Sequence, residues 1–265
     1  MNGLRISKCM MAFVGLAIAG LYSCSEDSVA PRDGEKLTQA ELEVILNSDD
    51  ISGIADDAIA DLFNDSSSAK MPTAKLNDCY VAEYLENGFV ATFNNCTLNG
   101  RDNINGTVAV SYSSTEGAAT FTATFDEFQA GDITISGTRE YILSQGSDAT
   151  SGSFTVNSDM TMVWADGRTI SESGTKTLTI QYDQATESLS LTVSGAWTVT
   201  TTDEHTYSVE TLGDLMADSS CEFLTSGKLN VSKSGLEVIV DFGDGSCDNK
   251  VTVTYPDGAT EEISM

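Results

Sequence analysis

Strict alternation of apolar and polar residues, repeated along most of the chain, is the feature that most constrains its fold. Between Ala119 and Phe125 every second residue is apolar, and the same two-residue period returns between Leu189 and Trp197. Successive side chains of a β-strand point to opposite faces of a sheet, so this period gives a strand one buried and one wet face. Such strands are typical of antiparallel sheets. The same period occurs in residues 108–112, 178–182, 238–242 and 251–255.

Turn signals separate the alternating segments. Dipeptides that end in glycine favour tight hairpin turns, because glycine readily adopts the positive φ that these turns require. Roughly a dozen strands joined in sequential hairpins, an all-β antiparallel meander, is the fold that this spacing predicts. The dipeptides are Glu116-Gly117, Asp166-Gly167, Ser234-Gly235 and Asp257-Gly258.

A loose repeat of glycines flanked by small residues runs through the same region. Glycine inside a strand usually marks a bulge, a sharp bend or the close approach of another backbone. Its recurrence predicts a strongly curved sheet, either a closed barrel or a half-barrel whose concave side receives a helix; a two-sheet sandwich is the alternative. The glycines are Gly106, Gly137, Gly152, Gly174, Gly195 and Gly227.

The residues before the strands have a helical period instead. Thr38 and Glu41 form a capping-box pattern ahead of the apolar Leu42, which predicts a short first helix. A second short helix is predicted after Asp50, with an apolar stripe that we expect to pack against its own domain. The stripe contains Ile51, Ile54, Ala55, Ala58, Ile59 and Leu62.

The N-terminus predicts export. Residues 1–8 carry only positive charges, and the following apolar run of 13 residues, Cys9 to Leu21, is too short for a membrane span of roughly 20 residues. Leu21-Tyr22-Ser23-Cys24 resembles the lipobox of bacterial lipoproteins, which implies cleavage before Cys24 and attachment of fatty acids such as palmitate to that cysteine. An ordinary secretory signal cleaved near residues 17–19 is the alternative.

The residues after Cys24 refine the expected location. Ser25-Glu26-Asp27 looks like the export signal of surface lipoproteins in the Bacteroidota, although a solvated acidic tether would read the same. We therefore expect a lipid-anchored protein of the outer membrane that faces the cell exterior. The predicted organisation is a signal peptide over 1–23, a flexible tether over 24–36, a helical segment over 37–70 and an antiparallel β domain over 71–265.

Charge excludes one class of partner. The chain has 40 acidic against 13 basic residues and a formal net charge of −27. Nucleic acids and anionic headgroups repel such a protein. The membrane is expected as a partner only through the lipid anchor, and the remaining ligand is open, with a glycan or a lipid as candidates.

Cysteine usage predicts two disulfides. Cys9 would leave with the signal peptide and Cys24 would be acylated, which leaves four cysteines in an oxidising compartment. We favour Cys79 with Cys96 and Cys221 with Cys247, because each pair brackets a short strand-turn unit. Zinc binding is disfavoured, since no Cys-x-x-Cys pair is present and His205 is the only histidine.

Residues for catalysis are scarce. His205 stands among polar residues of a predicted hairpin turn, so we expect an exposed residue rather than a base. Adjacent acids such as Asp126 with Glu127, or Asp203 with Glu204, should point to opposite faces of a strand and cannot flank one glycosidic bond. Trp197 alternates with core residues and is expected to be buried, whereas Trp164 is the better candidate for an exposed sugar-stacking ring.

One acidic loop is a candidate calcium site. Calcium binds six to eight oxygen ligands, and Asp241, Asp244 and Asp248 lie in a glycine-rich loop held by Cys247. The spacing does not match an EF-hand, and a plain hairpin turn is the alternative. We expect no other cofactor.

The layout resembles an uncharacterised family of β-rich lipoproteins from Bacteroidota and other Gram-negative bacteria. The resemblance lies in Asn95-Cys96, in Asn105-Gly106-Thr107 and in residues 242–249. It implies the fold and the location but no activity. Three functions therefore remain: a non-enzymatic binding or structural module at the cell surface, a carrier of a lipophilic ligand in a curved sheet, and a carboxylate-based hydrolase.

Overall fold

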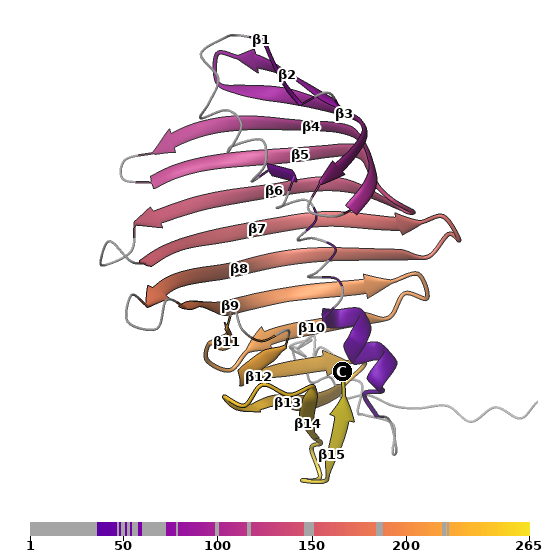
Figure 1. Cartoon of the computed structure of the whole chain (residues 1–265). Coiled ribbons are helices and arrows are strands. Elements are labelled where there is room, and N and C mark those ends of the chain that lie inside the picture. The colour runs from indigo at the N-terminus through magenta and orange to yellow at the C-terminus, as the bar shows by residue number, and fades with distance from the viewer. Residues whose placement is uncertain are drawn as a thin grey trace, which may run out of the picture.

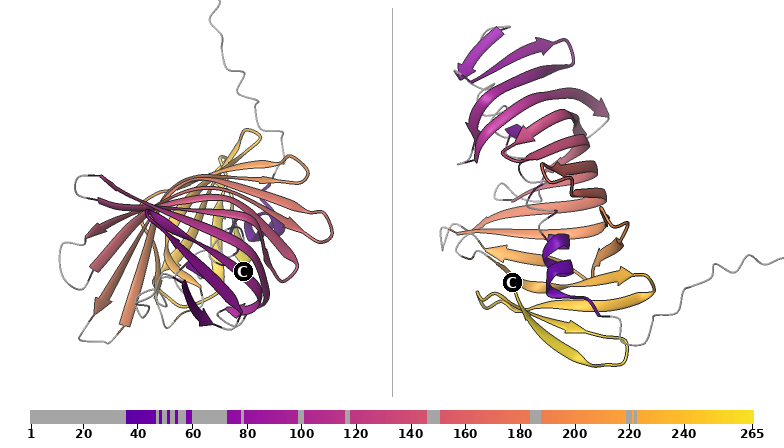
Figure 2. Two further views of the ribbon diagram at one scale, coloured as in Figure 1. Left: turned by 90° about the horizontal axis from the view of Figure 1, so that it is seen from above. Right: turned by 90° about the vertical axis from the view of Figure 1, so that its right-hand side faces the viewer.

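A computed structural model of the chain consists of one large, curved antiparallel sheet with a short helix on its concave side (Figures 1 and 2). The sheet agrees with the alternating pattern from which an antiparallel meander was predicted. The structure describes residues 36–46, 48, 51, 54, 58–59, 73–77, 79–98, 101–115, 118–145, 151–183, 188–218, 221 and 223–265.

Fifteen strands occur in these described residues, and nearly all of them pair with their neighbours in the sequence. The exception is at β10 and β11, which do not pair with each other: each pairs with both β9 and β12. The strands are β1 (Thr73–Asn77), β2 (Tyr80–Leu85), β3 (Gly88–Leu98), β4 (Arg101–Thr115), β5 (Ala118–Ala130), β6 (Ile133–Gln145), β7 (Ser151–Trp164), β8 (Thr169–Asp183), β9 (Ser188–Thr201), β10 (Thr206–Thr211), β11 (Leu215–Asp218), β12 (Leu224–Lys233), β13 (Leu236–Asp244), β14 (Lys250–Thr254) and β15 (Thr260–Ser264).

The single sheet decides between the predicted architectures. Its hydrogen-bonded path through the described strands begins at β1 and ends at β15, and these two strands do not pair with each other. The structure is therefore an open, curved half-barrel, and the two-sheet sandwich is wrong. Three of the predicted turns join strands as expected, whereas Glu116-Gly117 lies outside the described residues.

The apolar positions of the strands share one face, which we call the inner face; the opposite face is the outer face. Side chains of the inner face and of the N-terminal segment form the hydrophobic core. In the regular stretches of the strands whose burial is described, every second side chain belongs to this face, as the two-residue period requires. Its fully buried members include Phe89, Phe125, Phe128, Ile104, Ile135, Met160, Met162 and Leu229.

Glycines allow neighbouring strands to approach closely at the bends. A Cβ atom built at each of five predicted positions would lie only 2.1 to 2.7 Å from backbone of the neighbouring strand, and all five have positive φ. These positions are Gly106, Gly137, Gly174, Gly195 and Gly227. The sixth, Gly152, has open space around its Cβ position, so the expected close approach is wrong there.

The N-terminal helix begins with the predicted capping box. The Thr38 backbone N–H donates to Glu41 Oε2 at 2.9 Å, and the Glu41 N–H donates back to Thr38 Oγ1 at 3.3 Å. Residues 39–46 are helical. The second predicted helix falls mostly outside the described residues. The four of its predicted stripe residues that are described, Ile51, Ile54, Ala58 and Ile59, are helical.

The N-terminal helix, residues 39–46, is fixed to the C-terminal end of the sheet, where it lies beside β10 to β13 (Figure 1). Glu41 Oε1 accepts hydrogen bonds from Tyr207 at 3.0 Å and from Lys233. Lys36 forms an ion pair with Glu261 at 2.8 Å, on the last strand. Residues that are far apart in the sequence thus close the structure at one end.

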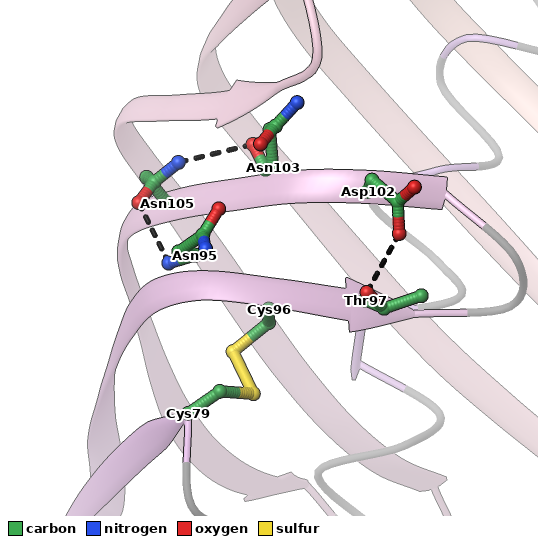
Figure 3. The surroundings of a disulfide bond; sticks show 7 residues. All are labelled: Cys79, Asn95, Cys96, Thr97, Asp102, Asn103 and Asn105. Atoms are coloured by element: carbon green, nitrogen blue, oxygen red, sulfur yellow. Dashed lines mark hydrogen bonds between the residues drawn. A yellow bond between two sulfur atoms is a disulfide. The ribbon is translucent and has the colours of Figure 1, made fainter.

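Both predicted disulfides are present, Cys79–Cys96 and Cys221–Cys247. The first lies beside an irregularity in the pairing of β3 with β4 (Figure 3). There the Asn95 N–H donates to Asn105 Oδ1 at 2.8 Å, and Asn105 Nδ2 donates to the Asn103 carbonyl at 3.0 Å. Two of the three motifs on which the family resemblance rests, those around Asn95 and Asn105, therefore meet in space.

Candidate functional site

The inner face is covered along only part of its length. On β6, Tyr141 is 5% exposed, whereas Leu143, the next inner-face residue, is 44% exposed. On β8 the exposed fraction rises from 4% at Lys176 to 41% at Ile180. Because both exposed residues keep the inner-face period, the sheet extends past its cover, toward the turns that follow β4, β6 and β8.

This open end carries a continuous row of apolar residues, which we call the apolar band. Its members are neighbours in the strand register: Tyr112 pairs with Phe121, Phe154 pairs with both Leu143 and Leu178, and Ile180 pairs with Leu191. The band consists of Tyr112, Phe121, Leu143, Phe154, Leu178, Ile180, Tyr182, Leu189 and Leu191. An exposed apolar patch of this kind marks an interaction site more often than an isolated apolar residue does.

A shallow groove of about 510 Å³ lies at the β4–β6 end of the band. Aromatic contacts support it: Phe121 stacks on Tyr141 with 4.5 Å between ring centroids, and the Tyr112 ring lies tilted against Phe89, with 6.2 Å between centroids. Burial, with a smaller contribution from Tyr84, raises the pKa of Tyr112, which therefore stays a neutral phenol. The groove is lined by Asn87, Tyr112, Ser113, Ala119, Thr120, Phe121 and Leu143.

Under its cover the inner face also holds charged residues. Lys176 Nζ lies 3.1 Å from Glu172 Oε1, and both side chains are buried. The two residues lie four positions apart on β8 and share the inner face, with Gly174 between them. Lys176 also lies over the Trp197 ring, 4.4 Å from its centroid. Arg139 is buried on β6 nearby. A buried pair of this kind is built into the core and is not open to a ligand.

A second groove of about 420 Å³ lies among the strands β8 to β12. Its polar lining residues belong to the outer face and are Ser173, Thr198, Ser208, Glu210, Asn230 and Ser232. Among the lining residues that the structure describes, Glu210 is the only carboxylate of this groove, and the groove by the apolar band has none. Glycoside hydrolysis needs two carboxylates across one bond, and these described residues do not supply such a pair.

The predicted acid pairs lie outside both grooves. Asp126 and Glu127 are both exposed, because a bulge interrupts β5 and gives Glu127 a φ of 47°. The expectation that these two neighbours occupy opposite faces of a regular strand does not allow for this irregularity. Asp203 and Glu204 are exposed in the turn between β9 and β10.

The predicted aromatic and histidine positions have different outcomes. His205 is exposed in the β9–β10 turn, as expected, and Trp197 is buried in the core. Trp164 is only partly exposed: it packs against the core, and the Arg168 guanidinium lies 5.2 Å from its ring centroid. It is therefore a poorer sugar-stacking platform than the sequence suggested.

The structure gives the calcium prediction no support. Asp241 pairs with Lys228 at 2.7 Å, Asp244 Oδ1 accepts a hydrogen bond from the Ser246 hydroxyl, and Asp248 accepts one from the Lys250 N–H. The Lys228 ammonium lowers the pKa of Asp241. Each carboxylate is thus satisfied within its own turn or strand pair, and no group of three potential metal ligands forms in the part of the chain that the structure describes.

Cys24 lies outside the described residues. Among the residues that are described, no helix has the length and apolarity needed to cross a bilayer. Searches against models of protein families, curated proteins and solved structures find no match. The site is therefore interpreted from its own geometry.

The alternating period predicted strands with a buried face for most of the band residues, but it gave no prediction for Leu143 or Phe154. Tyr112, Ile180 and Leu189 follow the same period as the core residues of their strands, and nothing in the period separates the two groups. Their exposure depends on how far the cover extends over the sheet. That is a tertiary property, which the alternation within one strand does not encode.

Proposed function

We propose that this protein is an exported, lipid-anchored binding protein without catalytic activity, which presents the open end of its inner face to a ligand. The observation that carries the binding role is the apolar band, exposed on a face that is otherwise the core. The N-terminal signal pattern and Cys24 support the export and the anchor. The acidic composition suits a solvated body held outside the cell.

The cover does not need to open for this function. The N-terminal segment buries Leu37, Leu42, Ile45, Ile54 and Ile59 almost completely against the sheet. Each buried side chain of this size contributes about 1.5–3 kcal/mol, which together exceeds a typical gating free energy of a few kcal/mol. The segment is therefore a permanent part of the core, and the band beside it is the accessible surface.

Metabolic labelling with an alkyne-tagged palmitate tests the anchor. We expect the wild-type chain to carry the label and Cys24→Ala to lose it. Cys9→Ala is the matched control, because that cysteine lies in the segment that cleavage removes, and it should keep the label. Label that persists in Cys24→Ala would contradict the anchor.

Proteolysis of intact cells tests the location. A chain that faces the exterior should be digested by added protease while a periplasmic marker stays intact. Digestion that requires prior permeabilisation of the outer membrane would place the body on the inner side, and the surface assignment would then fail.

A further inference from the structure

We infer that the apolar band binds a lipophilic molecule of extended, chain-like shape that lies across the strands from β4 to β9. This inference rests on the proposed binding function and names its ligand class. The band is longer than it is wide: adjacent strands lie about 4.8 Å apart, so six strands span roughly 24 Å. Along its widest strand, β8, the band runs from Leu178 to Tyr182, roughly 13 Å.

The chemistry of the band favours a lipophile over a glycan. Three of its five exposed members, Leu143, Ile180 and Leu189, are aliphatic and offer no hydrogen bond to a sugar hydroxyl. The other two are Tyr112 and Tyr182. No band residue is charged, and Tyr112 is a neutral phenol. Polar groups occur at one end, where Asn87 and Ser113 line the groove. A molecule with an apolar chain and one compact polar group fits this order.

The size of the groove agrees with a small ligand. Small-molecule sites usually enclose 300–1,000 Å³ and are concave, with few polar groups. The groove of about 510 Å³ falls within this range. It would take the polar end of the molecule, with the chain continuing over Phe154 and Ile180.

Charge argues against a second copy of the chain as the occupant. Each copy has a formal net charge of −27. Bringing two such chains together face to face is opposed by like-charge repulsion, whereas an uncharged lipophile carries no such cost. A long-chain alcohol, with the same apolar chain as a fatty acid but no carboxylate, is accordingly the probe of choice.

Photo-crosslinking in membranes provides the test. Cell-envelope vesicles that contain the full chain as the cell makes it are incubated with a long-chain alcohol carrying a diazirine, irradiated, and analysed by peptide mass spectrometry. We expect saturable adducts on the residues of the apolar band, on β4 to β9. Excess hexadecanol should suppress them and excess maltohexaose should not. Excess palmitate distinguishes a site that accepts a carboxylate from one that takes only neutral chains.

Matched variants separate the band from general lipid contact. At a limiting concentration of probe, Leu143→Ser and Ile180→Ser should each lower the adduct yield by roughly tenfold. A tenfold loss is expected because each substitution removes about half of the burial free energy of one such side chain. Val163→Ser and Ile239→Ser are the controls, since these residues are similarly exposed, at 39% and 38%, but belong to the outer face. They should leave the yield unchanged.

Three results would overturn the ligand class: adducts spread equally over both faces, suppression by maltohexaose, or chain-to-chain crosslinks through the band. In each case correct palmitate labelling at Cys24 and digestion at the cell surface would leave the anchored location standing. Loss of labelling together with normal band adducts would instead overturn the anchor and keep the ligand. The two proposals therefore fail separately.

Discussion

Gly174 allows β8 and β9 to approach each other closely. Its φ is 150°, and a Cβ atom there would lie 2.4 Å from the Trp197 Cα on β9. The space that a side chain would need is thus filled by the neighbouring strand, so only glycine fits this position without strain.

Gly174→Ala should destabilise the protein by more than about 2 kcal/mol, because the collision is with backbone, which cannot move aside as a flexible side chain can. Gly152→Ala is the control, since nothing lies near its Cβ position, and it should be neutral or stabilising by about 0.5 kcal/mol. Urea unfolding measures both. Equal effects of the two substitutions would show that the close approach at Gly174 is not limiting.

Glu41 is the residue that joins the helix to the sheet. Burial alone would raise the pKa of Glu41, but hydrogen bonds from Lys233, Thr38 and Tyr207 outweigh it and lower the pKa to about 2. Burial, together with the Glu41 carboxylate, raises the pKa of Tyr207. The ionised carboxylate is therefore the form that the folded state stabilises.

The pH dependence of this contact follows from the lowered pKa. Glu41 contributes its full stabilisation above the ordinary glutamate value near 4.5, and this is lost as pH falls toward about 2. Glu41→Gln should cost roughly 1–3 kcal/mol at pH 7. The stability difference between the two proteins should shrink below about pH 4.5. A difference that is constant from pH 7 to pH 3 would contradict the role of the charge.

At the scale of elements, strands and turns were predictable from sequence because their signals are local. The two-residue period between Ala119 and Phe125, and turns such as Ser234-Gly235, depend on adjacent residues alone. The capping box at Thr38 and Glu41 is equally local. Each of these is present in the structure.

The candidate site was not predictable in this way, because it depends on which part of the inner face the N-terminal segment covers. Lys176 and Ile180 follow the same period on β8, yet their exposed fractions are 4% and 41%. The bulge at Glu127 escaped prediction for a related reason, since the period gives no warning of an extra residue.

The N-terminal helix gives a prediction at this scale. Leu42→Ala and Ile45→Ala should each destabilise the protein by about 2–5 kcal/mol, because both side chains are fully buried between helix and sheet. Gln39→Ala, an exposed residue of the same helix, is the control and should change stability by less than about 0.5 kcal/mol. Thermal unfolding followed by circular dichroism measures all three. Small effects of the core substitutions would mean that the helix is not part of the core.

At the scale of the whole molecule, the dominant electrostatic fact is the excess of acidic residues. Several lysines are already paired at the surface, as in Lys36 with Glu261 and Lys250 with Glu262. Exposed pairs of this kind contribute about 0–1 kcal/mol each and weaken with salt. The acidic residues of a chain with a net charge of −27 repel one another, which opposes folding. Salt weakens this repulsion as well.

The balance of these two effects predicts the sign of the salt dependence. With 40 acidic and 13 basic residues, repulsion outnumbers attraction, so added sodium chloride should raise the melting temperature. The rise should be steepest between about 10 mM and 0.1 M, where the screening length falls from about 30 Å to about 10 Å. Potassium chloride should act equally, because screening depends on ionic strength rather than on the identity of the cation. A melting temperature that falls with salt would show instead that the surface ion pairs outweigh the repulsion.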